Sequence, residues 1–342
     1  MLRPARVGPW AATLAVATLI AAAGAGVMIG PADLPAREVL LALVDRIPLV
    51  DVPVELSDRQ LAILWELRVP RVVLGGLVGA MLALAGGAYQ GVFRNPLADP
   101  YLLGVAAGAG LGATLAIAGR ASGVTPGLVA PAAFIGAVVA VVLTYVLGRS
   151  AGERDPTTLV LAGVAVASFL TAAQTFVVQR NAESLREVYS WILGRLGTTG
   201  WSDVRAVLPY VVVGSGVILL HRRLLDVLGV GNEEAETLGV PTRRVRLTVV
   251  AAATLGTAAV VSVSGLIGFV GIIVPHTVRL VAGTGYRVVL PLSIVLGAAF
   301  LIAADLAART VAAPAELPIG VITAFLGAPF FMVVLRTTRG GS

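Results

Sequence analysis

Nine apolar stretches without a charged residue make up most of this chain. They cover residues 7–32, 72–93, 100–119, 121–148, 156–179, 206–221, 247–278, 288–304 and 317–335. A helix needs about 20 apolar residues to cross a hydrocarbon core of roughly 30 Å, so most stretches predict one membrane span each. The chain is 57% hydrophobic and 13% charged, and that low charge argues against an ordinary soluble domain. The expected fold class is an all-α polytopic membrane protein.

The stretch 247–278 is too long for one spanning helix and too short for two full ones. Its helix breakers are Gly256, Gly265, Gly268, Gly271 and Pro275. They predict a break near Ser264–Gly265 into one full and one short helix, and a short span is tolerated only where protein or a water cavity covers its backbone. The chain 1–342 is therefore expected to form a single transmembrane domain with ten helices.

Arginine placement predicts the orientation. The first apolar stretch exceeds the roughly 7–15 residues of a signal peptide core, so we expect it to remain as the first helix. With a cytoplasmic N-terminus, fourteen of the 25 basic residues fall in cytoplasmic segments, as the positive-inside rule favours. Both termini are therefore expected in the cytoplasm, with Trp65, Trp191 and Trp201 at the outer interface.

Several classes of site are excluded by composition. None of the 25 basic residues is lysine, so the chain cannot contain a Walker A loop, which needs its lysine. Any ATPase that drives it must be a separate polypeptide. There is no cysteine, and His221 and His276 are far apart, so no metal-ligand cluster is expected. The net charge of +6 comes without a basic patch, and nucleic acid is not an expected partner.

Small residues predict close helix packing in the segment 68–112. Gly75 and Gly79, and then Gly104, Gly108 and Gly112, recur at four-residue spacing on one helix face each, which lets backbones approach. Between the two helices, Asn95-Pro96 and Asp99-Pro100 predict turn or extended geometry before each proline.

A second informative segment, 226–246, predicts a two-turn helix in a loop. Asn232 is a good N-cap, and Glu233 and Glu234 occupy the first turn, where the helix dipole favours negative charge. Gly239 is placed to end the helix, and Pro241 prevents its continuation. Such a helix is too short to be stable alone. Either this protein or the groove of a partner must hold it.

Two apolar segments carry ionisable residues near their ends. Asp305 and Arg309 are one helical turn apart and can neutralise each other; alternatively, Arg309 presents its charge to a partner. His276 is interpreted as a helix-end residue rather than a ligand, because no second histidine or cysteine can join it.

Seven strings of the chain resemble the signature blocks of the FecCD family, and they occur in the family's order over about residues 60–336. They are RVPRVVLGGLVGA, FRNPLADPYLLG, LVLAGVAVAS, WILGRLG, EEAETLGV, SGLIGFVGIIVPHTVRL and PAELPIGVITAFLGAPFF. Members of this family are ABC importer permeases for ferric siderophores, haem and cobalamin. The resemblance implies a type II ABC importer permease fold with ten helices. It also implies a second permease subunit (a copy or a sister chain), two cytoplasmic ATPases and an extracytoplasmic substrate-binding protein.

The resemblance implies a role for individual residues. Arg68, Arg71 and Arg309 match outer arginines that receive glutamates of the binding protein. Asn95 and Leu97 match one cytoplasmic gate; a second gate is expected around Pro156, Thr157 and Thr158, although the string RDPTT departs from the family pattern. The segment 232–240 matches the helix that docks into the ATPase, with Asn232, Glu233, Glu234, Ala235, Thr237, Leu238 and Gly239. By helix face, the expected pathway-lining residues are Thr171, Gln174, Thr323 and Phe325.

The expected function is that of a non-enzymatic transport subunit in a bacterial plasma membrane, working by alternating access. It binds no cofactor itself, since ATP and Mg²⁺ belong to the partner ATPase. Ferric siderophore is the first expected substrate because it is the commonest in the family, with haem and cobalamin as rivals. Two other classes remain open. The first is an ion-coupled secondary transporter, which would need ionisable residues near the membrane midplane as a relay, and only Asp305 is a candidate. The second is a structural membrane protein without transport.

Overall fold

The computed structural model describes residues 8–123, 125–150, 156–197 and 199–339, and within these ranges all regular structure is helical. Ten apolar helices correspond in order to the predicted spans. They are α1 (Pro9–Met28), α4 (Val69–Phe93), α5 (Val105–Ala118), α6 (Val129–Ser150), α7 (Pro156–Arg180), α9 (Trp201–Leu220), α12 (Thr242–Ser264), α13 (Val270–Ala282), α14 (Tyr286–Thr310) and α15 (Ile319–Arg339).

Shorter helices lie between them. These are α2 (Ala36–Asp45), α3 (Asp58–Ala62), α8 (Leu185–Ile192), α10 (Arg222–Leu228) and α11 (Asn232–Thr237), with 3-10 turns at Gly119–Ser122, Pro126–Leu128 and Ala182–Ser184. A capping box starts α3: the Ser57 hydroxyl accepts from the Gln60 N–H, and the Gln60 carbonyl oxygen accepts from the Ser57 N–H. A π-helical turn, Ile63–Arg68, joins α3 to α4. Helix α2 was not predicted from the sequence.

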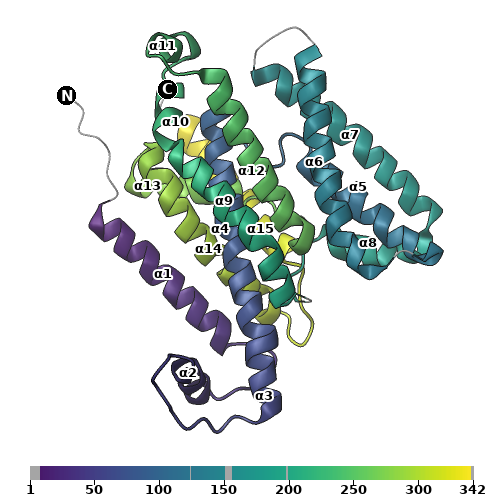
Figure 1. The fold of residues 1–342 in the computed structure, drawn as a ribbon, viewed down its shortest axis with the longest axis vertical. Helices are drawn as coiled ribbons and strands as arrows, with labels where there is room; N and C mark the ends of the chain where they lie inside the picture. Colours follow the sequence, from purple (N-terminus) through teal and green to yellow (C-terminus); the bar gives the residue numbers. More distant parts are fainter. Residues whose placement is uncertain (1–7, 124, 151–155, 198, 340–342) are drawn as a thin grey trace.

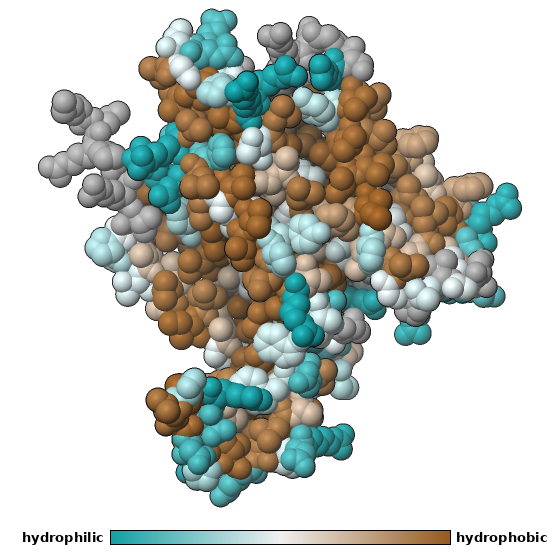
Figure 2. Space-filling model, in the orientation of Figure 1, coloured by the Kyte–Doolittle hydropathy of each residue, from teal (hydrophilic) through white to brown (hydrophobic). Residues whose placement is uncertain are grey.

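Seven of the described helices are long and apolar enough to cross a membrane. The apolar parts of α5, α13 and α15 are shorter, spanning Val105–Ala118, Val270–Ala282 and Ile319–Val334. The prediction of an all-helical chain with many apolar helices is confirmed. The count of ten crossings stays a prediction, because length and composition support seven. Apolar side chains cover the middle of the visible face, and hydrophilic ones gather at its two ends (Figure 2).

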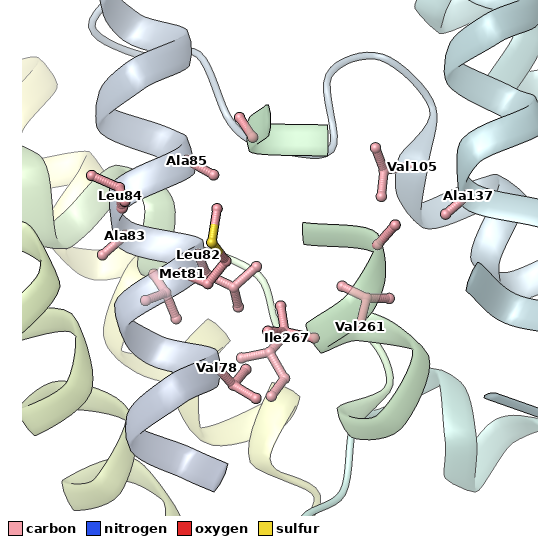
Figure 3. Packing of buried hydrophobic residues seen from close by; sticks show 14 of the residues in the cluster. Val78, Met81, Leu82, Ala83, Leu84, Ala85, Val105, Ala137, Val261 and Ile267 are labelled. Atoms are coloured by element: carbon pink, nitrogen blue, oxygen red, sulfur yellow. The ribbon is translucent and has the colours of Figure 1, made fainter. Parts of the chain in front are cut away.

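Helix α4 is the central element of the bundle. Twenty of its 25 residues are buried, and it packs against α14, α12, α13 and α9. Helices α5, α6 and α7 form a second group that joins the first through α12 (Figure 1). Within the first group, Met81 and Leu82 of α4 lie near Ile267, which follows α12 (Figure 3).

Glycines bring several of these helices into backbone contact. A Cβ on Gly79 of α4 would lie 2.2 Å from the Gly297 carbonyl oxygen of α14. Cβ atoms on Gly108 and Gly112 of α5 would meet the carbonyl oxygens of Gly136 and Ala132 at 2.2 and 2.1 Å. The predicted close packing is confirmed at these three positions. Gly75 and Gly104 differ, because the nearest atoms to their Cβ positions are side chains at 3.5 and 3.7 Å.

The predicted break in the long apolar stretch is confirmed. Helix α12 ends at Ser264, and Gly265 follows it with φ of +70°. Five irregular residues, 265–269, lead into α13, and Phe269 at its N-cap also has a positive φ, of 68°. The break is covered by protein, since Ser264 and Ile267 are buried, as an irregular segment at membrane depth requires.

Different short helices and loops lie at the two ends of the bundle (Figure 1). We call one the α2 end; it carries α2, α3, the start of α4 and the loop 311–318. We call the other the α11 end; it carries α10, α11 and the loop 94–104 after α4.

Candidate docking and gating sites

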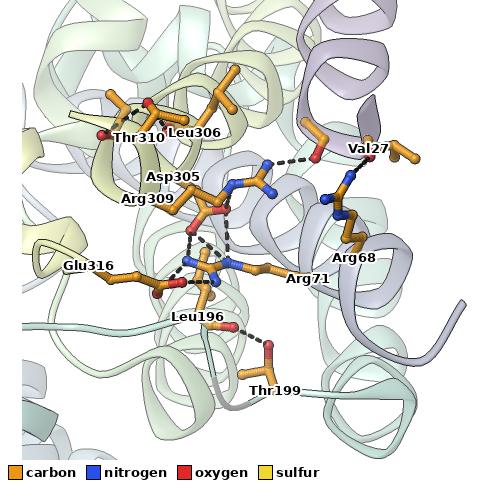
Figure 4. A network of polar contacts seen from close by, with 12 residues as sticks. Val27, Arg68, Arg71, Leu196, Thr199, Asp305, Leu306, Arg309, Thr310 and Glu316 are labelled. Carbon is orange, nitrogen blue, oxygen red and sulfur yellow. Dashed lines mark hydrogen bonds and ion pairs between the residues drawn. The ribbon is translucent and has the colours of Figure 1, made fainter. Parts of the chain in front are cut away.

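Arg71, near the start of α4, is held by two carboxylates from distant parts of the chain (Figure 4). Its Nε and Nη2 donate to the Asp305 carboxylate of α14 at 2.9–3.0 Å. Its Nη1 and Nη2 donate to the Glu316 carboxylate, both at 3.0 Å. Both planar edges of the guanidinium that can form a two-bond fork with a carboxylate are therefore occupied.

Arg68 and Arg309 bind the C-terminal end of α1. The last carbonyls of a helix lack intrahelical partners, and the Ile29 N–H satisfies only that of Ala25. Arg309 Nη2 donates to the Gly26 carbonyl at 2.6 Å, and Arg68 Nη1 donates to those of Val27 and Met28 at 3.1 and 3.0 Å. Arg68 Nη2 also donates to the Ala32 carbonyl. Two arginines thus complete the end of α1, where positive charge is favourable.

The three arginines predicted to receive the binding protein do lie together at the α2 end, but they are not free at the surface. Arg68 and Arg309 are 5% and 3% exposed, and Arg71 is engaged by its two carboxylates. The predicted pairing of Asp305 with Arg309 is present, with Arg309 Nε 3.5 Å from Asp305 Oδ2. Asp305 binds Arg71 more closely. The docking role of the three arginines stays a prediction. Sequence reasoning missed Glu316, although it lies within the quoted PAELPIG string.

The loop 94–104 forms turns, as its prolines predict. The Asn95 side chain accepts from the Leu97 N–H at 2.9 Å, and the Asp99 carboxylate accepts from the Tyr101 N–H at 2.8 Å. Burial raises the pKa of the Asp99 carboxyl to about 6, although the Tyr101 N–H lowers it in part. Asn95 and Leu97 are exposed at the α11 end. Their position agrees with the predicted gate, and the gating role stays a prediction.

This loop is attached to the break between α12 and α13. The Tyr101 hydroxyl accepts from the Ile267 N–H and donates to the Ile267 carbonyl, both at 3.0 Å. Pro100 lies against Gly271, where a Cβ would meet its ring at 2.6 Å. The loop and the irregular residues 265–269 are therefore mechanically connected. No local sequence pattern indicates the Tyr101 contact, which spans 166 positions.

The second predicted gate is described only in part. Helix α7 begins at Pro156, and Thr158 is half-buried in its first turn. The side chain of Thr157 lies outside the part of the chain that the structure describes.

Helix α11 is the short loop helix predicted from 226–246. Its C-terminal end is a Schellman motif, in which the Gly239 and Val240 N–H groups donate to the Glu236 and Ala235 carbonyls. Gly239 adopts φ of +79°, as its predicted role requires. The predicted N-cap is corrected: Gly231 precedes the helix and Asn232 is its first residue. The side chain of Asn232 lies outside the described part.

Helix α11 is held by its own protein on one face and open on the other. It packs on α10 and α12 with Ala235 fully buried. Glu233, Glu234 and Thr237 are exposed, as are Gly239 and Leu238, whose side chain is 69% exposed. Both alternatives left open by the sequence are thus compatible with the geometry, since an apolar side chain remains for a partner. Docking of an ATPase stays a prediction.

The residues predicted to line a pathway divide into two pairs. Thr171 and Gln174 of α7 line a hollow of about 470 Å³ that also includes Tyr101, Tyr189 and Leu266. Gln174 donates to the Thr114 hydroxyl at 3.0 Å. On α15, Thr323 is fully buried, whereas Phe325 is 75% exposed. The structure therefore places Thr171 and Gln174 at one hollow and leaves Thr323 away from any surface. The lining role stays a prediction.

Comparisons with known proteins give one consistent result. A model of the FecCD transport family matches residues 14–337. The cobalamin import system permease protein of Halobacterium salinarum is 48% identical over 274 residues, covering 80% of this chain and 73% of that protein. The hemin transport system permease protein of Yersinia pestis is 38% identical over 293 residues, covering 83% and 86%.

One solved structure has the same fold over nearly the whole chain. It is described as an inward-facing conformation of a metal-chelate type ABC transporter, with a TM-score of 0.84 and 26% identity. The match covers 96% of this chain and 100% of that one. Since family, relatives and fold agree over most of its length, this protein belongs to the FecCD transport family and is a permease of the ABC importer type.

Proposed function

We propose that this chain is the membrane permease subunit of an ATP-driven importer that moves a metal chelate into the cytoplasm by alternating access. The observation that carries the proposal is the layout of α4. This buried helix begins at the arginine cluster and ends at the loop 94–104, so it joins the predicted docking and gating ends directly. Closure at one end can then be transmitted to the other through one rigid element.

The proposed partners act at opposite ends. An extracytoplasmic binding protein docks at the α2 end and delivers the chelate. Two cytoplasmic ATPases, which bind ATP and Mg²⁺, contact α11 through its exposed acidic residues and Leu238. A second permease subunit packs beside α7 and α15, where Phe169, Phe176 and Phe325 are exposed. The protein lies in the plasma membrane with the α11 end in the cytoplasm.

We place cobalamin first among the substrates. The family resemblance alone favours ferric siderophore, because it is the commonest substrate class in the family. The relative named for cobalamin import, however, is 48% identical, against 38% for the one named for hemin transport. Haem and ferric siderophore remain the other members of the same substrate class.

The secondary-transporter alternative loses its candidate relay. Asp305 accepts hydrogen bonds from Arg71 and forms an ion pair with Arg309. Asp305 therefore serves as the shared counter-ion of two arginines, which accounts for an ionisable group at this place without a relay role.

Uptake in cells that lack the gene tests the proposal. Labelled cobalamin, haem and ferric siderophore are offered in parallel, with an empty plasmid, the wild-type gene or an Arg71→Glu gene. We expect loss of cobalamin uptake, restored by the wild-type gene and not by Arg71→Glu, because like charges would then meet at the docking site. Restoration of haem or siderophore uptake instead would change the substrate. Uptake of all three independent of the gene would contradict the importer.

A further inference from the structure

The two carboxylates that hold Arg71 differ sharply in environment. The Asp305 side chain is 4% exposed, lies on helix α14 and is shared with Arg309. The Glu316 side chain is 40% exposed and lies on the loop 311–318 between α14 and α15. Loss of Asp305 would leave the buried Arg309 guanidinium without a carboxylate partner and Arg71 with Glu316 alone, which is costly. Glu316 can turn to water, because its side chain is 40% exposed, whereas Asp305 has almost no access to solvent.

The backbone under Glu316 is fixed, so the side chain can move alone. The Leu317 N–H donates to the Ala308 carbonyl at 2.8 Å and holds the loop against the end of α14. The Glu316 carboxylate lies over Gly197, where a Cβ would come within 2.9 Å of its Oε2. Rotation of one side chain would therefore open the Nη1–Nη2 edge of Arg71, while Asp305 keeps the other edge oriented.

We propose that Glu316 is an exchangeable carboxylate, which a carboxylate of the extracytoplasmic binding protein displaces from the Nη1–Nη2 edge of Arg71. The inference rests on the proposed function, since it names how that partner gains access to a docking residue that is already paired. Of the three arginines, Arg71 is the one that donates hydrogen bonds to an exposed side chain, that of Glu316. The other two donate to buried or partly buried backbone carbonyls.

The exchange has two consequences. An undocked permease does not present an unpaired guanidinium, so stray anions find no ready site. A partner gains only if it offers a planar carboxylate at the right place, because a weaker acceptor cannot replace the existing two-bond fork. Glu316 thus lowers affinity for the binding protein and raises its specificity.

The first test needs no partner. The full-length permease, in its complex with the ATPase in lipid nanodiscs, is treated with phenylglyoxal, and modification of Arg71 is followed by mass spectrometry. We expect Glu316→Gln to speed modification several-fold, because it weakens the fork that covers the outer edge. Glu66→Gln is the matched control, since it removes one exposed negative charge at the same end. Equal rates in wild type and Glu316→Gln would overturn the inference.

The second test measures the affinity of the binding protein that supports uptake. Glu316→Gln and Glu316→Ala are expected to lower the Kd of the binding protein for the permease by about threefold to tenfold, since they remove the carboxylate that competes for Arg71. Glu66→Gln should change it little. An unchanged or higher Kd for a monodisperse Glu316→Gln complex would overturn the inference. Unimpaired binding by Arg71→Glu would instead contradict the proposed docking site, so the two failures are distinguishable.

Discussion

Arg68 and Arg309 connect a peripheral helix to the centre of the bundle. Helix α1 packs mainly on α14, and its outward face is apolar and exposed. Its last three unpaired carbonyls all accept from these two arginines. Arginine suits this task because its planar donors reach several acceptors at once and remain charged. The predicted docking residues therefore have a structural role that does not depend on any partner.

Arg68→Ala is expected to destabilise the protein by about 2–3 kcal/mol, because hydrogen bonds from a charged donor to buried carbonyls would be lost. Thermal unfolding in detergent measures the effect. Arg37→Ala is the matched control, since the Arg37 side chain is 84% exposed and 3.9 Å from Glu38. Equal melting temperatures for Arg68→Ala and Arg37→Ala would contradict the proposed capping of α1.

Asp99 predicts a dependence of stability on pH. Its folded pKa of about 6 lies above the ordinary value of 3.8, so the folded state holds a proton that the unfolded state releases between these values. The stability that the neutral carboxyl provides is fully present below pH 3.8 and is lost as the pH rises through 6.

Asp99→Asn keeps a neutral acceptor for the Tyr101 N–H. Its melting temperature should therefore exceed that of the wild type at pH 7, and the difference should shrink toward pH 4. The exposed Asp51→Asn serves as the control. A difference that stays constant from pH 4 to pH 7 would show that Asp99 is not the titrating group.

At the scale of elements, the sequence predicts those helix ends that glycine and proline residues nearby determine. The break at Ser264–Gly265 follows from glycines within a few residues of it, and the end of α11 follows from Gly239 and Pro241. Both were found as predicted. Helix α2 is not predicted from the sequence, because charged residues interrupt the segment 31–71. The structure shows that α2 is amphipathic, with Val39 and Ala42 on its buried face.

The site was predictable in its residues but not in its contacts. The arginines, the Asn95 turn and α11 could be located from motifs. The partners of Arg71 are 234 and 245 positions away, and those of Arg68 are 36 to 41 positions away. Pairings of this range depend on how helices cross, which single-sequence patterns do not encode. The motifs therefore predict outer arginines open to a partner, whereas the structure buries Arg68 and Arg309 and pairs Arg71 with two carboxylates.

The crossing of α4 and α13 gives a prediction at this scale. A Cβ on Gly86 would lie 2.1 Å from the Gly271 carbonyl oxygen, so Gly86→Ala must push the helices apart. We expect a loss of about 1–3 kcal/mol and reduced uptake, because α13 follows the break that holds the loop 94–104. Gly216→Ala is the control: nothing lies within 4 Å of its Cβ position, so the gain in helix propensity should dominate. Similar stability of the two variants would contradict the close crossing.

At the scale of the whole molecule, α4 sets the distance between the two functional ends. Arg68 precedes it and Arg94 follows it, and at the usual rise per residue they are about 40 Å apart. That distance matches the roughly 40–45 Å of a bilayer with its headgroups. The arginine cluster and the loop 94–104 should therefore lie on opposite sides of the membrane.

Cysteine labelling can test this orientation without background, because the native chain contains no cysteine. Leu49 at the α2 end is fully exposed and Leu238 at the α11 end is 69% exposed. With an impermeant maleimide, we expect Leu49→Cys to label in intact cells and Leu238→Cys only after permeabilisation. Ala88→Cys, at a buried position in α4, should label in neither case. The reverse pattern would place the arginine cluster in the cytoplasm, where no extracytoplasmic protein could reach it.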